Sequence, residues 1–350
     1  MQRDIKRVPV SRRQFLSRSV GVLGAGAVGS RHGGGSGHGD SLFGADTVPM
    51  VRNERCRQVL DRLKGPMASI TIPYNSNFSI DHGALRAWVD FMCEKKQPIL
   101  FLTYGDSELG FLKEQEIEAV IRTVATQARG RSLVIGGTGA WWTERTIEFI
   151  NRVEDSGVDA INVHMGSLTR NEDNLYAAYR DINDRTKLPL LTSSAKYSLD
   201  LLVRIAQLPN FIGDKCHEEL YKYHQYCRAT SKYDYAVLSA GLMKHFLFGY
   251  FAGSTAYLCA AAPFAPEMTL KFYHALTQGN YDAARDIVLQ FEDPLVDITS
   301  GLGYPHCYKS LLYLMGFYKT TLMRPPRISN HPEELGELKT FLQNHGLIAR

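Results

Sequence analysis

The sequence predicts an α/β fold, a parallel (β/α)8 TIM barrel with a C-terminal helical extension. Eight short apolar runs, typical of buried parallel strands, alternate with stretches in which apolar residues recur every three or four positions, as in amphipathic helices. This alternation continues for roughly 200 residues, which is enough for one such barrel. An open doubly wound sheet is the alternative, but no G-x-G-x-x-G motif follows the first expected strand.

The expected elements follow one another without interruption. A short helix is expected around 54–63 and is followed by the strands ASITIP, PILFLTY, SLVIGG, DAINVH, LPLLT, NFIG, YAVLS and STAYL. The helices expected between them are LRAWVDFMC, EIEAVIRTVATQA, TIEFINRVEDSG, LYAAYRDIND, LDLLVRIAQ and LMKHFLFGYF. The tail is expected to be all helix, with MTLKFYHALTQG, DAARDIVLQF, YKSLLYLMGFY and EELGELKTFLQ. The barrel is therefore expected over 51–262 and the C-terminal helical region over 263–350.

The first 50 residues do not fit the barrel pattern. Arg12 and Arg13 stand in SRRQFLS, and the weakly apolar SVGVLGAGAVG that follows is too short to span a bilayer. This order is similar to a twin-arginine export signal, so a signal peptide is expected over 1–29, with export of a folded protein to the periplasm. The Gly/Ser-rich segment 30–50 is expected to be a flexible linker. A basic disordered tail is the alternative for the signal.

The charge distribution argues against a nucleic-acid partner. Residues 1–27 contain six of the 40 basic residues and one of the 36 acidic residues, which leaves 34 against 35 in the rest of the chain. The body is therefore nearly neutral. No later segment is long and apolar enough to predict a membrane span, so no membrane partner is expected after signal cleavage. The six cysteines form no C-x-x-C pair, and we expect them to be buried free thiols.

In such a barrel, the chemistry lies where strands end and loops begin. That rule places the following side chains around one mouth: Tyr74, Asp106, Ser107, Glu108, Thr138, His164, Thr192, Ser193, Lys215, His217 and Ser239. Lys215 comes at the tip of the sixth expected strand. It is either a solvated lysine that opens a loop or an amine kept neutral so that it can attack a carbonyl.

Ordered segments of the chain resemble the dihydrodipicolinate synthase / N-acetylneuraminate lyase family of Schiff-base class I aldolases. The resemblance runs from about Gly65 to Ala284. Its segments are ITIPYNSNFSIDHGAL, YGDSELGFLKEQE, GRSLVIGGTGAWWTERTIE, LPNFIGDK and AGSTAYLCAAAPFAPE followed by QGNYDAAR. It implies a barrel, a homo-oligomer that is most often a tetramer, and Lys215 as the Schiff-base lysine. The imine that this lysine forms is the electron sink of that chemistry, so no cofactor is expected. No metal is expected either, because no H-x-H or H-E-x-x-H spacing is present.

Several positions depart from the family pattern. Ser193 stands where the family has a proton-relay tyrosine, and the tyrosine usual after strand four has no match. In the carboxylate-binding motif the two threonines fall on Gly105 and Asp106, and the second glycine becomes Ser107, while Glu108 is retained. A carboxylate at Asp106 would repel the carboxylate of a 2-oxo acid. Either Asp106 turns away or caps a turn, or the substrate presents hydroxyls or a cation there.

The sequence thus predicts a lyase of aldolase or dehydratase type that acts on a small carbonyl compound. The expected catalytic residues are Lys215, Ser193, His164 and Tyr197. The expected substrate-binding residues are Gly105, Asp106, Ser107, Glu108, Thr192 and His217. The alternative is a catalytically decayed barrel that serves as an exported small-ligand binding protein, and the two readings differ in whether an imine forms.

Overall fold

The computed structural model describes residues 52–194, 196–302 and 306–349. The expected signal peptide over 1–29 and the expected linker over 30–50 lie outside the described residues. Within the described ranges, none of the helices combines the length and the apolar character needed to cross a membrane. The six cysteines are buried and form no disulfide with one another.

Eight parallel strands close into a barrel in chain order, and this confirms the predicted fold. The barrel closes where the last strand pairs with the first, with Gly65 opposite Ala256. The strands are β1 (Gly65–Ser69), β2 (Ile99–Phe101), β3 (Leu133–Gly137), β4 (Ala160–Val163), β5 (Leu190–Ser194), β6 (Phe211–Cys216), β7 (Ala236–Ala240) and β8 (Ala256–Leu258).

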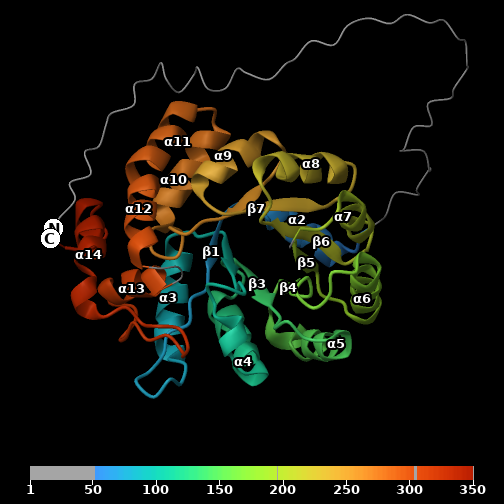
Figure 1. Ribbon diagram of the computed structural model, residues 1–350, viewed down its shortest axis with the longest axis horizontal. Helices are drawn as coiled ribbons and strands as arrows, with labels where there is room; N and C mark the ends of the chain where they lie inside the picture. The colour runs from blue at the N-terminus through green and yellow to red at the C-terminus, as the bar shows by residue number, and fades with distance from the viewer. Residues whose placement is uncertain (1–51, 195, 303–305, 350) are drawn as a thin grey trace, which may run out of the picture. The chain divides into compact units, whose positions relative to one another are not determined.

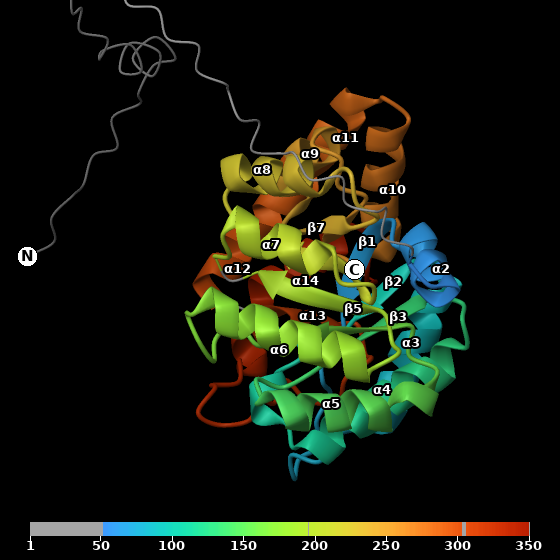
Figure 2. The ribbon, with the colours of Figure 1, turned by 90° about the vertical axis from the view of Figure 1, so that its right-hand side faces the viewer.

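Helices follow each strand and form the outer layer (Figures 1 and 2). Those between the strands are α3 (His82–Glu94), α4 (Glu114–Ala128), α5 (Thr143–Arg152), α6 (Glu172–Arg185), α7 (Leu199–Ala206), α8 (Leu220–Thr230) and α9 (Met243–Phe251). Helix α2 (Glu54–Arg62) precedes β1 as predicted. Asn53 begins α2 and its side chain accepts a hydrogen bond from the amide of Cys56, the usual N-cap arrangement.

The C-terminal region is mostly helical, but residues 315–331 form no helix, so the expectation of an all-helical tail is met only in part. Its helices are α10 (Pro266–Thr277), α11 (Tyr281–Ile287), α12 (Asp293–Leu302), α13 (His306–Leu314) and α14 (Gly336–Asn344), with a π-helical turn over Val288–Glu292. Helix α10 packs against β1 and α9, so it occupies the place of the eighth barrel helix. Figure 1 shows α12, α13 and α14 gathered on one side of the barrel, near α3.

The elements that differ from the sequence-based expectation include the first strand and helix α8. The first strand ends at Ser69, whereas the expected strand ran from 68 to 73. Its partner β2 ends at Phe101, which pairs with Ser69, so the pairing of the two strands stops there. The chain beyond Ser69 remains buried but is not part of a strand. Helix α8 was not predicted, because its buried face consists of Tyr223, Tyr226, Cys227 and Thr230 in place of an aliphatic stripe.

The barrel interior is filled by a separate apolar cluster beneath the mouth. It includes Met67, Phe101, Ile135, Leu191 and Ile212, all with essentially no solvent exposure. This packed floor fills the barrel interior beneath the mouth, as in other barrels of this kind.

Candidate active site

A cavity of about 310 Å³ opens at the carboxyl ends of β2 to β6. Six of the predicted site residues line it. The complete lining consists of Thr103, Tyr104, Gly105, Asp106, Ala140, His164, Gly166, Ser167, Ser193, Lys215 and His217. The structure therefore gathers the predicted lysine, serine and both histidines around one space.

A bulge in β6 brings Lys215 to the inside of the barrel. Leu190 pairs with Phe211 but Leu191 pairs with Gly213, so β6 has one extra residue, Ile212. Side chains of a regular strand alternate between faces, which would put Ile212 and Lys215 on opposite sides. The bulge shifts this alternation, and both side chains face inward, Ile212 in the interior cluster and Lys215 in the cavity.

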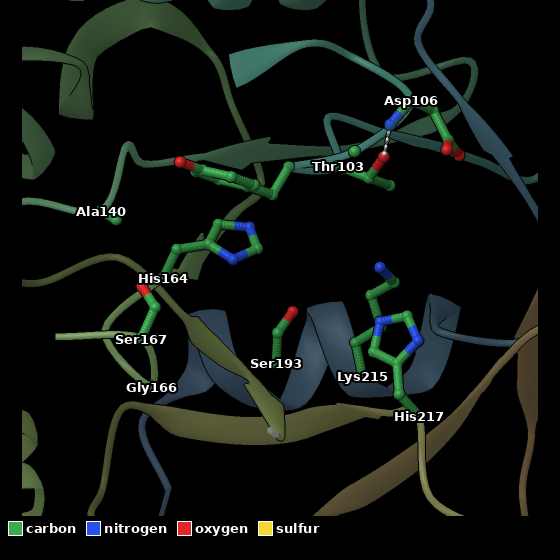
Figure 3. A pocket seen from close by; sticks show the side chains of 11 residues that line it. Thr103, Asp106, Ala140, His164, Gly166, Ser167, Ser193, Lys215 and His217 are labelled. Carbon is green, nitrogen blue, oxygen red and sulfur yellow. Dashed lines mark hydrogen bonds between the residues drawn. The ribbon is translucent and has the colours of Figure 1, made fainter. Parts of the chain in front are cut away.

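The amine of Lys215 lies in a poorly hydrated place. Lys215 is 5% exposed, and its Nζ lies 6.0 Å from the ring centre of Phe101. Burial lowers the pKa of Lys215, while the carboxylates of Asp106 and Asp214 act in the opposite direction. Figure 3 shows the amine pointing into the cavity toward the wall formed by Thr103 and Asp106. A buried amine with a lowered pKa has a larger neutral, nucleophilic fraction than a surface lysine.

A short polar chain joins two residues of the cavity wall through a buried asparagine. The side-chain nitrogen of Asn162 lies 2.9 Å from Nε2 of His164 and 3.1 Å from Oγ of Ser193. Asn162 is on β4, and Ser193 on β5 stands opposite Lys215 in the strand register. With Asn162 as donor, Nε2 of His164 is the acceptor and its proton lies on Nδ1. The arrangement connects groups that could carry protons near the amine.

Both histidines of the cavity are neutral at neutral pH. Burial, with Lys215 and His217 acting in the same direction, lowers the pKa of His164 to about 3. Burial likewise lowers the pKa of His217 to about 4, helped by Lys215 and His245. Neutral imidazoles offer one donor and one acceptor each, so they suit hydrogen bonding to a carbonyl or hydroxyl. The ring of Tyr104 lies beside His164, with 5.1 Å between the ring centres.

The loop after β2 brings Asp106 to the cavity wall. Asp106 is 4% exposed, and its backbone amide donates to the Thr103 hydroxyl at 3.2 Å. The Ser107 hydroxyl accepts from the Thr103 amide at 3.0 Å, so Ser107 holds the loop and does not line the cavity. Gly105 and Asp106 do line it, as predicted.

Glu108 faces away from the cavity toward the C-terminal extension. Its Oε1 accepts from Nζ of Lys309 on α13 at 2.6 Å, and both side chains are almost completely buried. The backbone of Glu108 has φ 54°, the left-handed region. Lys309 also donates to the carbonyl of Leu322, and it lies over the ring of Tyr74. Burial lowers the pKa of Lys309 to about 8, although Glu108 acts to raise it.

Thr192 and Tyr197 lie behind the cavity wall. The Thr192 hydroxyl donates to Asp214 at 2.6 Å, between the strands and the helices. The Tyr197 hydroxyl pairs with that of Tyr179 at 2.6 Å, and burial raises the pKa of Tyr197 well above its ordinary value. Neither residue lines this cavity, but Tyr197 lines a neighbouring one of about 530 Å³ that shares Gly166 and Ser167 with it.

Sequence reasoning missed Asn162, Tyr104 and Lys309. Asn162 lay in a run that was treated as a buried strand, although an asparagine inside such a run was a signal for a polar role. Tyr104 opens the segment YGDSELGFLKEQE, in which the sequence points only to the residues that follow it. Lys309 is remote in the sequence, and no local pattern indicated its partner. In the described part of the chain, no three His, Cys, Asp or Glu residues form a group that could hold a metal ion.

The closed parallel barrel defines the class: this is an α/β-barrel protein, with a buried lysine in a cavity at the ends of its strands. The chain belongs to the dihydrodipicolinate synthetase family, whose model matches residues 62–345. Family members include lyases of the synthase and dehydratase kinds.

Two curated relatives illustrate this range. The chain is 29% identical over 252 residues to a 4-hydroxy-tetrahydrodipicolinate synthase of Phenylobacterium zucineum, a match that covers 68% of this chain and 82% of the relative. It is 28% identical over 251 residues to a probable 5-dehydro-4-deoxyglucarate dehydratase 2 of Streptomyces avermitilis, covering 69% of this chain and 76% of the relative.

Solved structures agree with the fold. The dihydrodipicolinate synthase of Oceanobacillus iheyensis superposes with a TM-score of 0.74 at 21% identity, covering 84% of this chain and 100% of that one. The synthase of Acinetobacter baumannii complexed with pyruvate gives 0.74 at 23% identity, covering 82% and 100%. At these identities the likeness shows the fold.

Proposed function

We propose that the protein is a lyase of aldolase or dehydratase type that forms a Schiff base between Lys215 and a small carbonyl substrate. The observation that carries this proposal is the buried amine itself, which a β6 bulge directs into a cavity and whose pKa burial lowers. The relatives named above are a synthase and a dehydratase, which supports carbon–carbon or carbon–oxygen lyase chemistry.

The cavity residues supply the remaining roles. The neutral amine attacks the carbonyl carbon, and the resulting imine withdraws electrons from the adjacent carbon, where a carbanion then forms. His164 and Ser193, which are joined through Asn162, carry protons in place of the family's relay tyrosines. Gly105, Asp106 and His217 bind the substrate, while Ser107, Glu108, Thr192 and Tyr197 position the walls.

The second candidate is a decayed barrel that binds a small ligand without reacting with it. The missing tyrosine pair favours that reading. The burial of Lys215 argues against it, because an amine without a chemical role is costly to keep out of water.

Borohydride trapping separates the two candidates. Incubation with a panel of small aldehydes and ketones plus borohydride should add one reduced adduct per chain by intact-mass measurement. Lys215→Ala should abolish the adduct, and Lys196→Arg, which removes an exposed amine on the loop after β5, should leave it in place. Adducts that are scattered over surface lysines and unchanged in Lys215→Ala would favour the binding protein.

We also propose that the protein is exported through the twin-arginine pathway to the periplasm and works there as a homo-oligomer, most often a tetramer in such barrels. The paired arginines of the leader support the first proposal. Exposed aromatic side chains on the outer helices, including Phe248, Phe251 and Tyr281, support the second because they offer apolar contact surface.

A further inference from the structure

The charge of the cavity wall restricts which carbonyl compounds can approach Lys215. Asp106 is the acidic side chain of the lining and Lys215 is its amine, and the two histidines are neutral at neutral pH. The described lining contains no arginine. A second carboxylate placed beside Asp106 in this buried space would be repelled with little screening.

Three consecutive backbone amides next to the cavity are engaged within the loop. The amide of Asp106 donates to the Thr103 hydroxyl, that of Ser107 to the Thr103 carbonyl and that of Glu108 to the Gly105 carbonyl, each at 3.2 Å. Backbone amides form an anion site only when they point free into it. The amides of Asp106, Ser107 and Glu108 therefore do not form one.

The guanidinium groups near this loop are also already hydrogen-bonded to other protein groups. Arg327 donates to the carbonyl of Gly105 and lies over the ring of Phe111. Arg324 makes two hydrogen bonds to Glu116, at 2.6 and 2.7 Å. Neither arginine lines the cavity, so neither neutralises a substrate carboxylate there.

The other polar side chains of the cavity lining are suited to hydrogen bonds with hydroxyl groups of a substrate. Ser167, Ser193 and Tyr104, which carry hydroxyl groups, line the cavity together with the two histidines. Asp106 and His217 also line a second hollow of about 640 Å³, which extends toward α12 and includes Thr299 and Ser300. A carboxylate accepts hydrogen bonds from hydroxyls without adding charge, so Asp106 fits a hydroxylated substrate.

We propose that the carbonyl substrate of Lys215 is an uncharged hydroxylated aldehyde or ketone, with a hydroxyl on the carbon next to the carbonyl bound by Asp106, and not a 2-oxo acid. The inference rests on the proposed Schiff-base function. The amine attacks the carbonyl carbon, a carbon–nitrogen bond forms, the carbonyl oxygen leaves as water, and borohydride then reduces the imine by hydride addition.

Hydroxyacetone and pyruvate make a matched pair of probes, since they differ only in a CH2OH group against a carboxylate. Trapping rates at Lys215, divided by the rates for each compound on Nα-acetyllysine, should favour hydroxyacetone by at least about tenfold. Asp106→Asn and Asp106→Ser, checked for folding by circular dichroism, should each reduce that preference by about tenfold through faster pyruvate trapping.

The outcomes distinguish the two proposals. Equal or faster trapping of pyruvate in the wild-type protein would overturn the substrate class and leave the Schiff base standing. A preference unchanged in both Asp106 variants would show that Asp106 does not set it, which also overturns the inference. No adduct at Lys215 with either probe would remove the Schiff-base function, and the substrate class with it.

Discussion

The buried ion pair between Glu108 and Lys309 gives the sharpest stability prediction. It joins the loop after β2 to α13 of the C-terminal region at 2.6 Å, with side-chain exposures of 0% and 2%. Within the described residues, Oε2 of Glu108 has no hydrogen-bond partner. Lys309→Met would therefore leave a carboxylate buried with its cation removed.

The magnitude follows from the burial. Breaking a buried pair by removing one partner costs about 3–5 kcal/mol. Unfolding entropy is about 2.1 cal/mol/K per residue, or about 0.6 kcal/mol/K over about 300 folded residues, so Tm should fall by about 5–8 °C. The double variant Glu108→Leu with Lys309→Met removes both charges and should recover most of that loss.

Differential scanning calorimetry on the wild type, Lys309→Met, Glu108→Leu and the double variant measures the effect. Arg185→Met is the matched control, because Arg185 and Glu144 are also 2.6 Å apart but lie exposed on the surface. Its Tm should stay close to that of the wild type. A Lys309→Met protein as stable as the wild type, or a double variant less stable than both singles, would refute the reasoning from burial.

The other predictions concern pH, export and assembly. Asp106 acts to raise the pKa of Lys215, so Asp106→Asn should move the midpoint of the pH dependence of imine trapping to lower pH, and a shift to higher pH would contradict the assigned geometry. Changing Arg12 and Arg13 to Lys should retain the protein in the cytoplasm by cell fractionation, whereas unaffected export would reject the twin-arginine signal. Light scattering at micromolar concentration should give the mass of a homo-oligomer, most often a tetramer, and a monomer would contradict that proposal.

Much of the fold was predictable because it depends on local periodicity. Strands with continuous apolar runs and helices with aliphatic stripes both leave a pattern in the sequence, and their alternation is enough to indicate a barrel. Helix α8 could not be predicted from this periodicity, because tyrosines and not aliphatic residues form most of its buried face. The end of β1 could not be predicted from local sequence, because it depends on the length of the neighbouring strand β2.

The site was predictable only in part. The rule that strand ends carry chemistry placed Lys215, Ser193, His164 and Asp106 together, and the structure brings them to one cavity. It did not distinguish inward from outward residues near a bulge or in a loop, so Thr192 and Glu108 were assigned to the substrate although they face elsewhere. Contacts between distant segments, such as that of Lys309, leave no local signal.

A crystal structure of the protein after borohydride reduction with hydroxyacetone tests the central claim most directly. The account predicts a covalent bond from Nζ of Lys215 to the reduced carbonyl carbon, with the adduct's hydroxyl within hydrogen-bonding distance of the Asp106 carboxylate. An unmodified Lys215 in crystals whose protein carries the adduct on another lysine would contradict it.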